Sequence, residues 1–367
     1  MAGRIVLHIG LQKSGSTYLQ RVLQLNGRAL ADAGIRYPIS LDWRRGRRSV
    51  VNHEWATYGV LGPEYPWVSE QRAKKERAGW DRLADEVRRW PGTVLLSAEA
   101  LSVIRAPAVD RFVGLLDTAE VDVVITARDL GRSLPSLWQQ HIRNGRRGSF
   151  DRFLRTLGEQ RDGAPEHVED EVGAHVWRAF ALGRLVRRWG SVVGPARISV
   201  VTVPASAPPA RLWTRFSQAA GVPRGAADEA PAELDEPVHT GLTAPELEVL
   251  ASLNAALEEA GWSRGPAARL RADVVEGFMN RDDRGPKPAI PPSWRSRVAE
   301  WSKQDVAEII DAGVAVVGDV SDLRYEPDRS DPPSPSHAEL TGCTAAAILA
   351  AGTGSGRSLR LRRRVLP

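Results

Sequence analysis

The sequence predicts an α/β fold in three layers, with a parallel sheet covered by helices on both faces and a mainly helical C-terminal half. Two observations lead to this prediction. Up to Val203, short apolar runs rich in β-branched residues alternate with segments whose apolar residues recur at helical spacing. Strands that alternate with helices in this way form parallel sheets, whereas most of the chain after Val203 has helical spacing alone.

Five segments have the length and composition of buried strands. The first, Arg4 to Ile9, contains Ile5, Val6, Leu7 and Ile9 and is followed by a polar loop flanked by glycines. The others are 93–97, 121–127, 197–203 and a short last strand at 314–317.

The predicted helices carry an apolar side at helical spacing, and several stop at Gly or Pro. They cover 16–33, 70–90, 108–116, 132–144, 175–189, 210–220, 244–260, 267–280 and 293–312. Four tryptophans at apolar helical positions are expected to pack in the core, namely Trp138, Trp177, Trp189 and Trp213.

The composition changes after Tyr325. We predict one α/β domain over 1–325 and a disordered tail over 326–367, first rich in Pro and Ser and then in Arg. Within this tail, the run TAAAILAAG has the composition of a short helix. A solvated tail is the simpler interpretation, and the alternative is an electrostatic contact of its basic end with an anionic surface.

Composition favours a soluble globular protein, with 42% hydrophobic and 26% charged residues. No apolar run reaches the roughly 18–20 residues that span a membrane, and we expect no signal peptide because the first residues enter a strand. The single cysteine, Cys343, excludes an internal disulfide and a thiolate metal cluster. A cytoplasmic protein without a metal is therefore expected.

The charge does not indicate a nucleic-acid partner. The net charge is +5, and the six arginines and three acids from Pro327 onward supply +3 of it. The remainder is close to neutral, so the pI of 9.6 reflects the tail more than a binding surface. Four further arginines, between Trp43 and Ser49, are interpreted as a solvated loop or as a mobile loop on the substrate side.

The loop from Gly10 to Thr17 nearly matches the phosphate-binding pattern G-x-x-x-x-G-K-[ST]. Such a loop turns its backbone N–H groups toward one anion at the start of a helix. Gly10 and Gly15 have the required spacing, but residue 16 is Ser, and Lys13 lies inside the loop instead. The displaced lysine disfavours ATP hydrolysis and suits a nucleotide whose 5′-phosphate is itself the leaving group.

These residues resemble a known family. Gln12-Lys13-Ser14-Gly15-Ser16-Thr17 is similar to the 5′-phosphosulfate loop P-K-[ST]-G-[ST]-T of sulfotransferases that use 3′-phosphoadenosine 5′-phosphosulfate (PAPS), with Gln12 departing at the first position. A longer part of the sequence, from about Arg4 to Leu323, resembles a bacterial group of sulfotransferase-like proteins. The segments that carry this wider resemblance are LHIGLQKSGSTYLQ, VLLSAEALS, ITARDLGRSLPSLWQQHIRNG, ISVVTVPA and AGVAVVGDVSDL.

The resemblance implies further cofactor residues. In the family, an arginine at a strand end and a serine eight residues later bind the 3′-phosphate, and Arg128 and Ser136 match this spacing. Ser133 is a competitor one helical turn earlier. The six loop residues from Gln12 to Thr17 would hold the 5′-phosphosulfate. The family's R-K-G-x-x-G-x-W segment has no clear counterpart in this sequence.

The expected reaction is transfer of a sulfuryl group from PAPS to a hydroxyl or amine of a small-molecule, sugar or lipid acceptor. Lys13 would stabilise the departing phosphate, and a general base would accept the acceptor's proton. His53 is the first candidate for the base and Glu99, just after the second predicted strand, is the next; each could instead be structural. Two alternatives stay open: a non-catalytic nucleotide-binding or assembly module of the same fold, and a P-loop nucleotide kinase.

Overall fold

The computed structural model describes residues 2–38, 53–117, 120–163, 169–227, 241–327 and 335–363. The arginines between Trp43 and Ser49 lie outside these ranges. The chain forms two compact units. The first comprises Met1–Leu130, Leu157–Asp235 and Arg297–Tyr325, and the second comprises Gly131–Thr156, Glu236–Ser296 and Glu326–Pro367.

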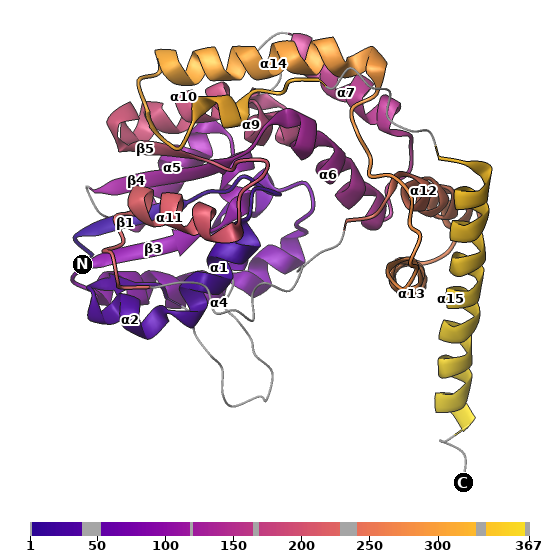
Figure 1. Cartoon of the computed structure of the whole chain (residues 1–367). Helices are drawn as coiled ribbons and strands as arrows, with labels where there is room; N and C mark the ends of the chain where they lie inside the picture. Colours follow the sequence, from indigo (N-terminus) through magenta and orange to yellow (C-terminus); the bar gives the residue numbers. More distant parts are fainter. Residues whose placement is uncertain are drawn as a thin grey trace. The chain divides into compact units, whose positions relative to one another are not determined.

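The first unit contains a six-stranded sheet in which every adjacent pair of strands is parallel, in the order β2-β3-β1-β4-β5-β6. Figure 1 shows the strands as arrows with helices on both sides. The predicted α/β class is therefore confirmed. The strands are β1 (Arg4–His8), β2 (Ile35–Arg36), β3 (Thr93–Ser97), β4 (Val121–Ala127), β5 (Ile198–Thr202) and β6 (Ala315–Val317). All but the two-residue β2 coincide with predicted strands.

One face of the sheet packs against the helix that follows the glycine loop. Val6, Leu95, Val124 and Val201 alternate onto this face from four strands and are buried. They pack with apolar residues of α1 (Ser16–Leu25), α2 (Gly27–Asp32) and α11 (Pro209–Ala220). This layer fixes where α1 begins, and hence where the loop lies.

The opposite side of the sheet is covered by further helices of the same unit. The helix α10 (Leu182–Val193) contacts β4, β5 and α5 (Ala106–Leu116). The remaining helical elements of this unit are α3 (His53–Leu61), α4 (Glu70–Arg89), α9 (His175–Phe180) and the 3-10 helices η2 (Gly62–Glu64), η3 (Glu99–Val103), η4 (Val172–Ala174), η5 (Pro195–Arg197) and η7 (Val320–Leu323).

Two long predicted helices are each divided in the structure. The predicted helix 16–33 breaks at Asn26, whose side chain and backbone N–H groups both bind Val22 O. The predicted helix 175–189 breaks at Ala181, between α9 and α10. Apolar spacing continues across both breaks, so periodicity alone did not reveal them.

The second unit is helical. Three helices, α6 (Leu130–Arg143), α7 (Phe150–Asp162) and α14 (Pro292–Asp311), contain the boundaries between the units, and α12 (Ala244–Glu259), α13 (Arg264–Met279) and α15 (His337–Arg363) lie within the second. The structure here differs from the expected disordered tail, because α15 contacts α12 and α13 and buries Cys343. The four tryptophans assigned to the core are buried, as predicted.

The sheet order places a topological switch at β1. From β1 the chain continues to β2 and β3 on one side, and β4, β5 and β6 follow on the other. Open parallel sheets bind ligands beyond the carboxyl ends of their strands at such a point. The loop from Gly10 to Gly15 directly follows β1 and so lies there.

Candidate functional site

The glycine loop leaves β1 through three residues in the left-handed region of backbone conformation. They are Gly10 (φ 105), Lys13 (φ 63) and Gly15 (φ 88), and Gly15 is also the N-cap of α1. Glycine adopts this conformation without steric penalty, whereas lysine rarely does. The first N–H groups of α1 have no partner within the helix and carry its positive dipole end. The loop therefore has the backbone requirements of an anion site.

The carbonyl groups of the loop are bound from inside the protein. Gly10 O accepts from Thr126 N (2.5 Å) and from Thr126 Oγ1 (3.0 Å). Leu11 O accepts from the hydroxyls of Ser14 and Ser16. These hydrogen bonds orient the carbonyl oxygens toward β4 and the start of α1.

His8 links this loop to the sheet. Its Nδ1 lies 2.8 Å from Ser97 Oγ and its Nε2 lies 3.1 Å from Thr126 Oγ1, and all three side chains are buried. The contacts follow from the sheet register, since His8 and Ser97 are paired across β1 and β3. Thr126 Oγ1 also lies 3.0 Å from Gly10 O and 2.7 Å from Ser14 Oγ, so His8, Thr126 and the loop share one buried hydrogen-bond network. Burial lowers the pKa of His8 to about 3, so the ring is neutral.

The predicted loop residues fall into two groups. Ser14 and Ser16 are buried, and their hydroxyls point inward to Leu11 O, so these side chains shape the loop. Lys13 and Thr17 are exposed. Gln12 is half-buried, and its role in holding a donor stays a prediction from the motif.

Glu99 begins η3, two residues after the end of β3, and its carboxyl is tied to the glycine loop. Burial, followed by the negative charge of Glu54, raises the pKa of Glu99 to about 7. A hydrogen bond from Ser16 and the positive charge of Lys13 act in the opposite direction. Ser16 has one hydroxyl proton, so it serves either Leu11 O or Glu99 at a time. Lys13, Ser16 and Glu99 thus act on one another at the carboxyl end of the sheet, and their roles in a reaction stay a prediction.

His53 is placed differently from Glu99. It is 3% exposed, its Nε2 lies 2.5 Å from Pro38 O, and its Nδ1 accepts from Ser97 N at 3.0 Å. Burial lowers its pKa to about 4. Both ring nitrogens are engaged with backbone groups, which is the pattern of a structural histidine that anchors α3 to the end of β3. Of the two candidates for the base, these contacts favour Glu99.

Glu54 is a residue of the site that sequence reasoning missed. Its carboxylate accepts from Tyr58 OH (2.7 Å) and from Ala100 N (3.3 Å), directly beside Glu99. The one available signal was its position next to His53, and nothing local distinguishes it from a surface glutamate at the start of a helix.

Arg128 follows β4 at the same carboxyl edge as the loop, two residues after Thr126, and it is half-buried. Ser136 and its competitor Ser133 lie on α6 in the second unit, where Ser133 is buried and Ser136 half-buried. The pairing of Arg128 with Ser136 at one phosphate stays a sequence prediction.

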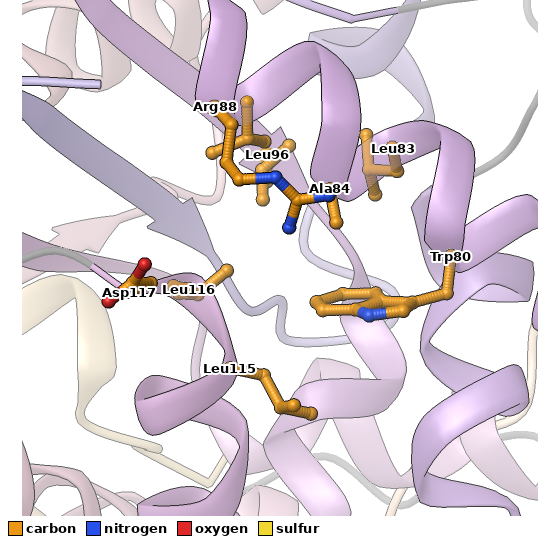
Figure 2. Close-up of a pocket in the computed structure, with 9 residues that line it drawn as sticks. Trp80, Leu83, Ala84, Arg88, Leu96, Leu115, Leu116 and Asp117 are labelled. Atoms are coloured by element: carbon orange, nitrogen blue, oxygen red, sulfur yellow. The ribbon is translucent and has the colours of Figure 1, made fainter. Parts of the chain in front are cut away.

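A separate pocket lies against α4. Figure 2 shows Trp80, Leu83 and Ala84 of α4 facing Leu115 and Leu116 of α5, with Arg88 and Asp117 at its margin. No residue of the glycine loop lines this pocket.

Within the described ranges, no three or more His, Cys, Asp and Glu side chains are grouped as a metal site would require. None of the described helices has the length and apolarity of a membrane span.

The fold and this loop define the class: an α/β protein with a phosphate-loop-like turn at the switch point of a parallel sheet. Comparison with known proteins does not narrow this class further. No family model matches the chain, and no curated protein matches it. A solved sulfotransferase from Alicyclobacillus acidocaldarius matches with 13% identity and a TM-score of 0.40, over 85% of this chain and 96% of that one. Similarity at this level decides nothing about the activity.

Proposed function

We propose that the protein is a sulfotransferase that moves the sulfuryl group of PAPS to a hydroxyl or amine of a small-molecule, sugar or lipid acceptor. One observation carries the proposal. The loop that contains Lys13 and the residue Glu99 lie against each other at the switch point of the sheet, where a Cβ on Gly10 would lie 3.5 Å from Glu99 Cα and O, and burial raises the pKa of Glu99 to about 7. A cation for a leaving phosphate and a base for an incoming hydroxyl are the two groups that such a transfer needs.

In the proposed step, the acceptor oxygen or nitrogen forms a bond to sulfur while the bond from sulfur to the bridging oxygen breaks. The electron pair of that bond stays on the 5′-phosphate of the departing 3′-phosphoadenosine 5′-phosphate (PAP), where Lys13 offsets the added charge. Glu99 in its ionised form accepts the proton of the acceptor. Because its pKa lies near neutrality, a large fraction of Glu99 is ionised at pH 7 and still basic enough to act.

Donor binding is assigned as follows. The N–H groups of the loop and of the first turn of α1 hold the 5′-phosphosulfate, as the resemblance of Gln12 to Thr17 implies. Arg128 suits the 3′-phosphate because a guanidinium offers two parallel hydrogen bonds to it. The role of Ser136 in the same contact rests on the sequence motif.

Calorimetric binding of PAP tests this assignment without knowledge of the acceptor. Wild-type protein is expected to bind PAP more tightly than AMP, which lacks the 3′-phosphate. Lys13→Ala and Arg128→Ala should each weaken PAP binding about 10- to 100-fold, the range expected for a lost charge-assisted hydrogen bond. Lys74→Ala, at an exposed position of α4, is the matched control and should bind as wild type does.

The result also separates the alternatives. Folded wild type that fails to bind PAP, or Lys13 and Arg128 variants that bind it normally, would overturn the assignment. PAP binding with no transfer of labelled sulfuryl groups to extracts of the native cell would indicate a non-catalytic module. Magnesium-dependent ATP turnover that is lost on Lys13 substitution would indicate a kinase.

A further inference from the structure

The carboxylate of Glu54 is held in place from two sides. Tyr58 OH donates to Oε1 at 2.7 Å, and Tyr58 itself accepts from Trp67 Nε1 at 3.1 Å. The backbone N–H of Ala100 points to Oε2 at 3.3 Å. Burial and the charge of Glu54 both raise the pKa of Tyr58 above its ordinary value, so the phenol stays protonated and keeps donating.

The start of α3 is attached to the end of β3 by two consecutive residues. His53 accepts from Ser97 N, and Glu54 accepts from Ala100 N. Glu99 lies between these two amides in the chain, immediately before Ala100. The Glu54 carboxylate is therefore held next to Glu99 by the backbone N–H of Ala100 on one oxygen and by Tyr58 OH on the other.

The groups that act on the Glu99 carboxyl come from three elements. Lys13 comes from the loop after β1, Ser16 from the first turn of α1, and Glu54 from α3. Lys13 and Ser16 stabilise the ionised form, whereas burial and Glu54 oppose it. Glu54 is the only one of the three residues whose charge has the same sign as that of ionised Glu99.

We propose that Glu54 is a positioning residue of the site: its carboxylate, held by Tyr58 OH and Ala100 N, acts on the neighbouring carboxyl of Glu99. That Glu99 is the general base rests on the proposed function, but the coupling of the two carboxyls does not. With Glu54 present, ionised Glu99 is a strong enough base to accept a proton from a hydroxyl. Without that charge, burial alone would oppose Lys13 and Ser16, and Glu99 would be ionised at lower pH and be a weaker base.

The test is a titration of glutamate carboxyls by NMR on the full chain, with ¹³C-labelled glutamate and no ligand. The signal of Glu99 is identified by its loss in Glu99→Gln. Glu54→Gln removes the charge and keeps a hydrogen-bond acceptor, and it is expected to move the midpoint of Glu99 to lower pH by about 1 unit. Glu70→Gln, at the exposed start of α4, is the matched control and should leave the midpoint unchanged.

A Glu99 midpoint that stays in place in folded Glu54→Gln would overturn the proposal, because burial alone would then account for the raised pKa. Glu54→Ala, which also removes the charge, takes the place of Glu54→Gln if that variant does not fold. A Glu99 midpoint that stays in place in folded Glu54→Ala would again overturn the proposal. Calorimetry with PAP is independent of both titrations, so a failure of the proposed function would be recognised separately.

Discussion

At the scale of single residues, Lys13 combines a charge with an unfavourable backbone conformation. Its φ of 63 is left-handed, which costs a non-glycine residue about 1 kcal/mol. We expect Lys13→Gly to raise the free energy of unfolding by about 0.5–1 kcal/mol and to weaken PAP binding at least 10-fold. Urea denaturation and calorimetry measure the two effects. Lys13→Gly without any gain in stability would show that the loop bears no strain at this residue.

The half-buried carboxyl of Glu99 makes stability depend on pH. Its pKa is about 7 in the folded protein and 4.5 in the unfolded chain, so the folded state binds the proton more tightly. This contribution is complete below pH 4.5 and is lost as the pH rises through 7, by up to about 3 kcal/mol. The free energy of unfolding of Glu99→Gln, measured relative to that of wild type by urea denaturation, should therefore increase from pH 5 to pH 8. Equal differences at both pH values would contradict the raised pKa.

His53 is expected to give stability the opposite dependence on pH. Burial lowers its pKa from 6.5 to about 4, so its contribution is complete above pH 6.5 and is lost as the pH falls toward 4. His53→Gln should be less stable than wild type at pH 7, by on the order of 2 kcal/mol, with a smaller deficit at pH 4.5. Urea titrations at both pH values measure this. A deficit that does not change with pH would argue against a neutral buried ring.

At the scale of elements, the C-terminal segment forms α15, which packs closely against α13. A Cβ added at Gly277 would lie 2.9 Å from the Cβ of Ala350 and 3.3 Å from Ala346 O. Small residues on both helices permit this distance. Cys343 is also buried, with its sulfur 2.6 Å from Nη1 of Arg281. The alanine run in the sequence indicated a helix, but the partner helix lies some 70 residues earlier, which spacing could not reveal.

Gly277→Leu should therefore lower the free energy of unfolding by about 1–3 kcal/mol, because the added side chain has no room. Gly265→Leu is the matched control on the same helix. A Cβ there has only Arg269 Nη1 within 4 Å, at 3.8 Å, so the change should be neutral or mildly stabilising. Thermal denaturation compares the two variants. If α15 were a solvated tail, both would behave alike.

At the scale of the whole molecule, a ligand of the glycine loop should stabilise the fold by mass action. PAP at 100 times its dissociation constant is expected to add about 2.7 kcal/mol to the free energy of unfolding. Hydrogen exchange should slow in the loop and the first turn of α1, because their amides would bind phosphate oxygens. Protection confined to other segments would place the ligand elsewhere and contradict the proposed site.

The sequence by itself determined the α/β class, five of the six strands, and the loop with its displaced lysine. These features depend on local periodicity and on residues adjacent in the chain. It also indicated Lys13 and Glu99 as site residues, because parallel strands end at one edge of a sheet. It did not reveal β2, which has two residues, or the interruptions at Asn26 and Ala181, where the apolar spacing continues.

Only the tertiary structure showed that both ring nitrogens of His53 are engaged and that Glu54 lies next to Glu99. The backbone amides of Ser97 and Ala100 engage His53 and Glu54 from more than forty positions away, and those contacts exist only when α3 packs on the end of β3. Likewise, His8 reaches Thr126 across 118 positions through the register of neighbouring strands. Burial and charge at such contacts determine proton affinity, so the chemistry of these residues follows from their neighbours in space.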